Sequence, residues 1–284
     1  MIDFDSLWDY SDPAGTEQKF RAALPAIGPD PGRRAELLTQ IARAQGLQRL
    51  FTKAHATLDD AQALLPQTAA RPRLRYLLER GRVFNSSGRP DQARPLFREA
   101  WEAGQAAGED ALAVDAAHML AMVAPPAEQM DWNRKALALA ERSADPEARR
   151  WLGSLYNNIG WTHHAGGEYE QALAVFIQAE QWREAQGQAR EARIARWCVA
   201  RALRSLGRPD EALSRQQALR AELEAAGETD GYVDEELGEC LLALGQADAA
   251  RPHFARAHAA LSQDPWLAER EPGRLERLRR LGQP

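Results

Sequence analysis

The sequence has few β-branched aliphatic residues: Ile and Val together occur only 12 times in 284 residues. β-Sheets depend on such residues to fill a pleated, half-buried surface, so this scarcity excludes barrels, sandwiches and doubly wound α/β folds. Alanine, in contrast, occurs 54 times, and Ala, Leu, Arg, Glu and Gln are residues that favour helices. The composition therefore predicts an all-α protein.

Cysteine and an excess of positive charge are also lacking. The formal net charge is −5, so no general basic field favours nucleic acid. The two cysteines, Cys198 and Cys240, form neither a disulfide framework nor a metal motif, which fits a reducing compartment. Residues 1–5 lack the basic start of a secretory signal, and no apolar run approaches the roughly 18 residues of a membrane span. We expect a cytoplasmic protein with neither a nucleic-acid nor a membrane partner.

One pattern recurs along the chain. A helix with a small residue at its centre is followed by a Gly-containing turn, and then by a helix with Ala, a large apolar residue and Ala. Small central residues allow two helices to cross closely, and the turn glycines supply positive φ. The three clearest copies contain Leu77, Gly81, Phe84, Gly88, Ala93, Phe97 and Ala100; Tyr156, Gly160, His163, Gly167, Ala172, Phe176 and Ala179; and Leu237, Gly238, Leu241, Gly245, Ala250, Phe254 and Ala257.

The second-helix alanines give the period of this pattern. They lie at Ala54, Ala93, Ala172, Ala212 and Ala250, with a degenerate copy between Ala93 and Ala172, so each unit is about 36 to 43 residues long. Each unit is long enough for two antiparallel helices, and the interior between them is predicted to be filled by Phe97, Phe176 and Phe254.

The pattern resembles the tetratricopeptide repeat family, over roughly residues 34–262 and with units longer than the family norm. The resemblance implies one domain over residues 1–284, a right-handed α-solenoid of about six helical hairpins. Residues 1–33 and 263–284 are expected to cap it, because the terminal units of a solenoid need a polar outer face. Within these caps, residues 13–27 and 266–282 are each expected to form one helix.

Catalytic and metal-binding motifs are not recognisable. The sequence contains no Gly-rich phosphate loop, no Gly-x-Ser-x-Gly and no nucleophile with an oriented base. His163 and His164 are adjacent and so face about 100° apart on a helix, which makes them poor co-ligands for zinc. We therefore expect neither an enzyme nor a cofactor, and no metal.

A concave groove is the expected binding surface, because the first helices of successive units line it in such solenoids. Trp, Tyr and Arg dominate binding hot spots, and Arg recognises carboxylates with two-pronged geometry. The residue pattern favours an extended protein or peptide segment with an apolar anchor and an acidic group or free C-terminal carboxylate, and the family resemblance also implies peptide binding. The groove residues are Arg75, Arg82, Asn85, His118, Asn157, Trp161, His164, Trp197, Arg201, Arg204 and Tyr232.

Three alternatives are consistent with the same residues. Trp161 and Trp197 could pack on each other across adjacent units without a specific ligand. The groove could instead bind a small signalling peptide or an anionic metabolite, which would make the protein a regulatory sensor. The array could also serve self-association. The sequence predicts a non-catalytic scaffold or adaptor, and identifies neither its partner nor its oligomeric state.

Overall fold

A computed structural model describes residues 4–283, which form helices joined by turns and contain no strand. The α-helices are α1 (Pro13–Ala23), α2 (Pro31–Leu47), α3 (Phe51–Leu64), α4 (Ala70–Ser86), α5 (Pro90–Ala107), α6 (Asp110–Val123), α7 (Pro126–Arg142), α8 (Pro146–Arg149), α9 (Leu152–Ala165), α10 (Tyr169–Ala185), α11 (Ala189–Ser205), α12 (Pro209–Ala225), α13 (Gly231–Ala243), α14 (Ala247–Leu261), α15 (Pro265–Arg270) and α16 (Pro272–Leu281). Short 3₁₀ helices cover Asp5–Leu7, Leu24–Ile27 and Leu65–Gln67. The predicted all-α repeat fold is confirmed.

Local sequence signals explain where the helices begin and end. Asp12 and Asp30 cap α1 and α2 by accepting hydrogen bonds from backbone N–H groups of the first turn, and each is followed by a proline, which needs no N–H partner. The predicted turn glycines Gly88, Gly167, Gly207 and Gly245 all have φ between 74° and 79°. Such left-handed backbone is strained for residues with a Cβ, so these glycines fix the turns.

Six helical hairpins follow one another: α2–α3, α4–α5, α6–α7, α9–α10, α11–α12 and α13–α14. The large residue predicted to fill each clear unit is buried: Phe97 and Phe176 are fully inaccessible, and Phe254 is 1% exposed. The predicted small residues lie directly against these rings. A Cβ added to Gly238 would come within 2.8 Å of Phe254 Cε1. The close crossing of paired helices therefore requires glycine at this position.

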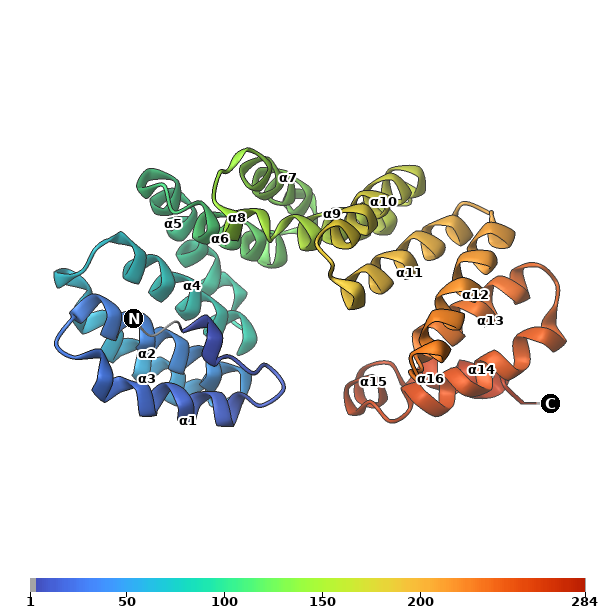
Figure 1. Cartoon of the computed structure of the whole chain (residues 1–284), viewed down its shortest axis with the longest axis horizontal. Coiled ribbons are helices and arrows are strands. Elements are labelled where there is room, and N and C mark those ends of the chain that lie inside the picture. Colours follow the sequence, from blue (N-terminus) through green and yellow to red (C-terminus); the bar gives the residue numbers. More distant parts are fainter. Residues whose placement is uncertain (1–3, 284) are drawn as a thin grey trace. The chain divides into compact units, whose positions relative to one another are not determined.

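The chain divides into two compact units between Leu155 and Tyr156, and each is described by itself. In the first unit, α2, α4 and α6 are the first helices of their hairpins, and α1 packs on α2 (Figure 1). In the second unit, α11 packs on α10 and α12, while α13 packs on α12 and α14. The expected single-domain organisation stays a prediction, and residues 1–3 and 284 of its caps lie outside the described residues.

The two caps differ from the sequence-based expectation. The helix expected over residues 13–27 ends at Ala23, and Pro25 lies in the 3₁₀ helix that follows. The helix expected over residues 266–282 is two helices, because Pro272 cannot continue the hydrogen-bonding of α15. Moreover, α16 does more than face solvent: its Leu275 and Leu278 are buried in a cluster with Phe254 of α14.

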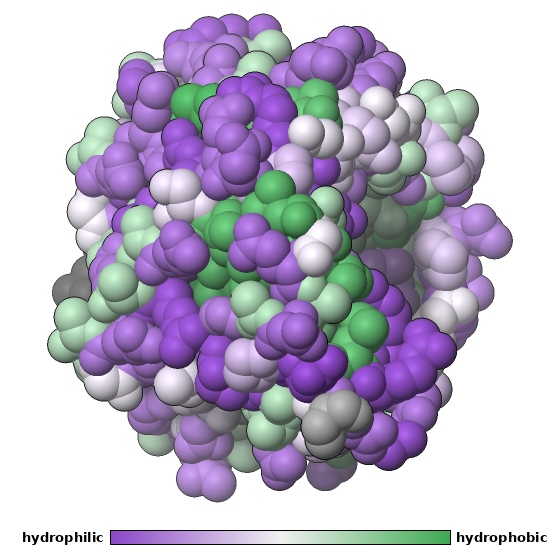
Figure 2. Space-filling view, turned by 90° about the vertical axis from the view of Figure 1, so that its right-hand side faces the viewer, coloured by the Kyte–Doolittle hydropathy of each residue, from purple (hydrophilic) through white to green (hydrophobic). Residues whose placement is uncertain are grey.

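The face of the molecule drawn in Figure 2 is mainly hydrophilic. In the space-filling view, apolar residues gather in the middle of a face that is otherwise polar (Figure 2). Among residues 4–283, no helix combines the length and the hydropathy that spanning a bilayer requires.

Candidate functional site

An aromatic strip crosses the second unit from α9 to α13. We define it as Trp161, Trp197 and Tyr232, which come from the first helices of three successive hairpins. The ring centroids of Trp161 and Trp197 are 6.0 Å apart, and those of Trp197 and Tyr232 are 6.4 Å apart. The Trp197 indole Nε1–H donates a hydrogen bond to the Tyr232 carbonyl oxygen at 3.0 Å, which fixes the orientation of the central ring.

The strip is both packed and accessible. Trp161 lies edge-on to the buried Phe176, with the ring centroids 5.2 Å apart, so part of its surface belongs to the core of its hairpin. Trp161 and Trp197 are half-buried, whereas Tyr232 is 38% exposed. The alternative in which the two tryptophans pack on each other therefore describes part of the geometry, but it leaves aromatic surface available to a partner.

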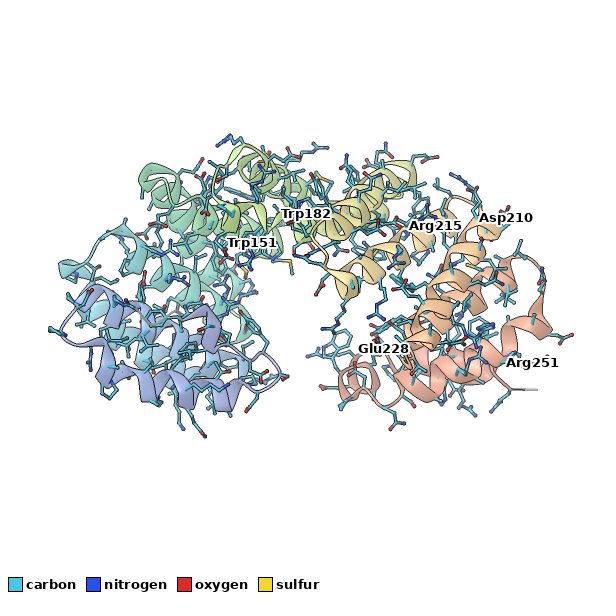
Figure 3. All side chains as sticks on the ribbon, viewed as in Figure 1. Trp151, Trp182, Asp210, Arg215, Glu228 and Arg251 are labelled. Atoms are coloured by element: carbon cyan, nitrogen blue, oxygen red, sulfur yellow. The ribbon has the colours of Figure 1, made fainter. Side chains whose placement is uncertain are left out.

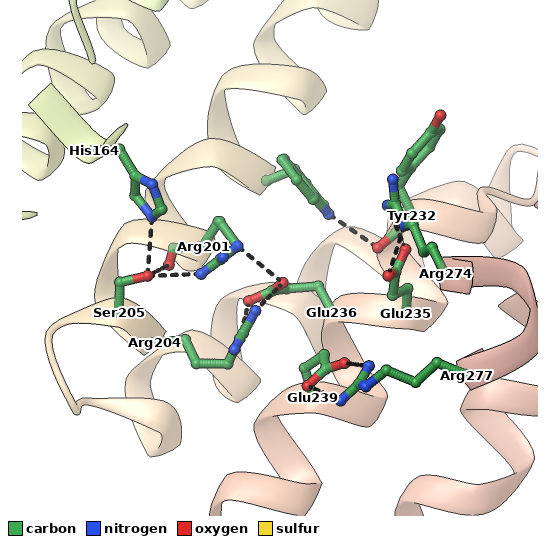
Figure 4. Close-up of polar contacts among 11 residues, drawn as sticks. His164, Arg201, Arg204, Ser205, Tyr232, Glu235, Glu236, Glu239, Arg274 and Arg277 are labelled. Atoms are coloured by element: carbon green, nitrogen blue, oxygen red, sulfur yellow. Dashed lines mark hydrogen bonds and ion pairs between the residues drawn. The ribbon is translucent and has the colours of Figure 1, made fainter. Parts of the chain in front are cut away.

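Two arginines beside the strip share one carboxylate (Figure 4). Arg204 makes a two-pronged contact with Glu236, with 3.0 Å between Nη2 and Oε2. Arg201 Nη1 donates to Ser205 Oγ at 2.6 Å, and its Nε is 3.9 Å from Glu236 Oε2. Burial and the neighbouring Arg204 lower the pKa of Arg201. The cluster therefore holds two cations against one buried anion, and one positive charge is in excess.

The last helix, α16, supplies further arginines, which contact acids of α13. Arg274 of α16 contacts Glu235 of α13 with 2.6 Å between Nη2 and Oε2, and Arg277 of α16 contacts Glu239 (Figure 4). Arg274 also lies over the Tyr232 ring, with its guanidinium carbon 5.3 Å from the centroid. These contacts hold the exposed end of the strip in place, since a cation over an aromatic face is attractive.

In the first unit, the predicted Arg82 lies in a buried ion-pair network. Its guanidinium contacts Asp115 of α6 and Glu79 of its own helix, and Arg43 of α2 donates to Glu79 Oε1 at 3.3 Å. The Arg82 side chain is 16% exposed, Asp115 10% and Glu79 3%. The network links three successive first helices, so Arg82 contributes to the packing of adjacent repeats.

The other groove residues predicted in the first unit lie in different surroundings. Arg75 is half-buried near Glu36, and its Nε is buried without a hydrogen bond. Asn85 is half-buried near the end of α4. His118 packs on Trp151, with the ring centroids 5.1 Å apart, and burial lowers its pKa. These residues and Arg82 stay predictions as groove residues. Of the four, the structure places His118 near Arg82 and its partner Asp115.

The histidines and thiols of the second unit have local partners. His163 contacts Glu168, whereas His164 Nε2 lies 2.9 Å from Ser205 Oγ. The Cys198 thiol donates to Asn157 Oδ1 at 3.6 Å. Burial raises the pKa of both Cys198 and Cys240 to about 12, which leaves them as unreactive thiols at neutral pH.

Acidification is expected to destabilise the second unit through His164. Burial, and then the nearby Arg201 and Arg204, lower the pKa of His164 from its usual 6.5. The folded chain therefore binds this proton more weakly than the unfolded chain. This contribution to the free energy of unfolding is complete above pH 6.5 and is lost as the pH falls below that value.

Chemical denaturation at a series of pH values measures this effect by comparing the wild type with His164→Gln, which cannot titrate but can still bond Ser205. The variant should lose less stability than the wild type between pH 7.5 and pH 5.5, and His258→Gln serves as the control. Equal slopes for the wild type and His164→Gln would contradict the prediction.

In both units, sequence reasoning missed the carboxylates that pair with arginines of the preceding hairpin. Glu79, Asp115 and Glu236 lie 36, 33 and 32 residues after the arginines that reach them from the preceding hairpin, Arg43, Arg82 and Arg204. These separations are close to one repeat. An arginine on one first helix and an acid about one repeat later was therefore the signal that could have identified them.

Comparison with known proteins supports the repeat assignment. A family model for the tetratricopeptide repeat matches residues 153–186, which span most of α9 and all of α10. No curated protein matches the sequence.

Three solved structures illustrate the likeness in fold. The apo form of RapI has a TM-score of 0.73 at 10% identity, covering 92% of this chain and 75% of that one. A signal-transduction ATPase with a tetratricopeptide repeat sensor from Pyrococcus horikoshii has a TM-score of 0.72 at 13% identity, covering 95% of this chain and 42% of that one. A tetratricopeptide repeat protein from Parabacteroides merdae has a TM-score of 0.55 at 14% identity, covering 98% and 95%. At such identities the likeness shows the fold alone.

Proposed function

We propose that this chain, in which a tetratricopeptide repeat model matches residues 153–186, is a non-catalytic scaffold or adaptor that binds an extended protein segment along the first helices of its second unit. The observation that carries this proposal is the half-exposed aromatic strip of Trp161, Trp197 and Tyr232, one ring from each of three successive hairpins. Rigid aromatic surface on regularly spaced helices offers apolar contact at little entropic cost, which is typical of binding hot spots.

The partner chemistry follows from the charges beside the strip. Arg201 and Arg204 have only Glu236 between them, so an additional anion would complete the pairing of Arg201. The Arg201 side chain is 29% exposed and can be reached, whereas the Glu236 side chain is 3% exposed. We therefore propose a segment with an apolar anchor on the strip and an acidic side chain or a C-terminal carboxylate at Arg201.

Peptide-display selection against the full chain tests this proposal. The wild type should enrich peptides that combine an apolar residue with a nearby carboxylate, and synthetic versions should bind about tenfold more weakly to Arg201→Gln. That loss corresponds to one charge-assisted hydrogen bond. Gln can still bond Ser205, which limits the effect on folding.

Arg215→Gln is the matched control, because Arg215 lies on α12, the second helix of its hairpin, and pairs with Glu180 of α10. The control should bind the selected peptides as the wild type does. Trp161 is unsuitable for the test, since its contact with Phe176 would make loss of binding inseparable from loss of stability. The absence of any enriched peptide, or equal affinity for the wild type and Arg201→Gln, would refute the proposed mode of binding.

A further inference from the structure

A pocket of about 660 Å³ lies beside the strip in the second unit. It is formed by the N-terminal half of α11, the C-terminal end of α12, the loop that follows α12 and the first turn of α13. Its size lies within the range of small-molecule sites, roughly 300–1,000 Å³. The lining residues are Arg190, Arg193, Ile194, Trp197, Leu219, Leu223, Glu228, Thr229, Asp230, Tyr232 and Val233.

The walls of the pocket are mainly apolar. Leu219, Leu223 and Val233 are buried in one cluster, against which Trp197 packs. Ile194 is 51% exposed, which is a large fraction for an aliphatic side chain of this size. The Trp197 and Tyr232 rings, which meet at 78°, both line the pocket. These walls suit a flat or aliphatic apolar group.

The acids and the indole of the pocket are already bonded within the protein. Glu228, labelled in Figure 3, accepts from Arg193 Nη1 at 2.9 Å. Asp230 caps α13 by accepting from the Tyr232 backbone N–H at 2.8 Å, and the Trp197 N–H donates to the Tyr232 carbonyl oxygen. These groups therefore do not require a ligand.

Three other polar side chains of the pocket are not bonded within the described part of the protein. Among the described residues, the Arg190 guanidinium makes no hydrogen bond or ion pair, and the hydroxyls of Thr229 and Tyr232 make no hydrogen bond. The three residues that carry these donors all line one mainly apolar pocket, and one of them carries a full positive charge. This combination is complementary to an anion attached to an apolar body.

A pocket of the first unit shows the opposite arrangement. It measures about 490 Å³ and lies among α3, α4 and α5. Its Tyr76 hydroxyl donates to Gln62 Oε1 at 2.9 Å, and its Arg73 pairs with Glu99 at 2.6 Å. Because these polar groups bond one another, that pocket offers a ligand no unpaired charge. The pocket beside α11 is therefore the stronger candidate for a ligand site.

We infer that this pocket binds a small amphipathic carboxylate, with its apolar body between the aliphatic wall and the rings of Trp197 and Tyr232 and its carboxylate on Arg190. An Arg–carboxylate contact is charge-assisted and two-pronged, which gives both affinity and orientation. This site goes beyond the proposed peptide binding. It shares the rings of Trp197 and Tyr232 with the strip, but its anion contact is Arg190 and not Arg201, which does not line the pocket.

Isothermal titration calorimetry with three matched probes tests the inference: 4-phenylbutyrate, its neutral amide 4-phenylbutyramide, and 4-phenylbutylamine. The wild-type chain should bind the acid about tenfold more tightly than the amide and should not detectably bind the amine. Arg190→Gln should bind the acid and the amide equally, and Arg190→Glu should prefer the amine. Arg190 is exposed and unpaired, so these variants should melt as the wild type does.

Arg270→Gln, which changes another exposed arginine of the same unit, should keep the wild-type preference for the acid. Arg201→Gln should keep it too, so failure of peptide binding and failure of this site are distinguishable. The inference is overturned if none of the three probes binds at millimolar concentration, if acid and amide bind the wild type equally, or if Arg190→Gln retains the preference. A selected peptide that displaces the acid and depends on Arg190 would also overturn the assignment to a free small molecule.

Discussion

Replacing Arg82 with Met is expected to destabilise the first unit by about 3–5 kcal/mol, the typical result of breaking a buried ion pair on one side. Arg82 is the common partner of Asp115 and Glu79, and all three side chains are largely buried. Removing the guanidinium leaves Asp115 without that partner inside the protein, and leaves Glu79 with only Arg43 at 3.3 Å. The two carboxylates would then repel each other in a medium that solvates them poorly.

Denaturant unfolding followed by circular dichroism measures this loss. Arg73→Met is the matched control, because Arg73 lies on the same helix but forms an exposed pair with Glu99. The control should change the free energy of unfolding by less than about 0.5 kcal/mol.

A further variant isolates the cause. Combining Arg82→Met with Glu79→Gln and Asp115→Asn also removes the two carboxylate charges that Arg82 had paired. The triple variant should therefore recover a large part of the lost free energy of unfolding. If the single and triple variants were equally unstable, the packing of the arginine stem would be responsible, and the ion-pair explanation would be wrong.

The sequence determines the hairpins well because their signals are local. Glycine at a turn, proline at a helix start and the Ala–Phe–Ala spacing of the second helix each act within a few residues, and Gly88, Pro90, Ala93 and Phe97 lie where these signals predict. The last cap was predicted less well. Its Arg-rich composition suggested one exposed helix, whereas Pro272 divides it and its leucines fill a gap beside α14.

The site is harder to predict, because composition does not show which charges are already paired. Arg82, Arg201 and Arg204 are all arginines on the first helices of hairpins, where ligand-binding residues are expected. Arg82 and Arg204 make close contacts with buried acids, whereas Arg201 Nε lies 3.9 Å from the Glu236 carboxylate that Arg204 already contacts. Similarly, the aromatic positions followed from repeat spacing, but the pocket beside them depends on Leu219 and Leu223 of a second helix. Residues brought together by packing between hairpins leave no local pattern.

Gly81→Ala is expected to destabilise the first unit by about 1–3 kcal/mol, the usual range for overpacking a core. A Cβ at this position would lie 2.7 Å from Phe97 Cζ. The ring cannot swing away, since Phe97 is fully buried. This cost is larger than the gain that alanine normally brings to a helix interior, which is about 0.5–1 kcal/mol relative to glycine.

Two further variants separate the collision from helix propensity. Gly46→Ala is the matched control, because its Cβ would meet Val83 Cγ2 at an ordinary 3.6 Å, and it should leave stability unchanged or raise it by up to about 1 kcal/mol. Gly81→Ala combined with Phe97→Leu should be more stable than the sum of the two single changes predicts, since the shorter side chain leaves room for the methyl group. Strictly additive effects in denaturant unfolding would show that Gly81 and Phe97 are not coupled. The close helix crossing would then have a different cause from the contact between this glycine and this ring.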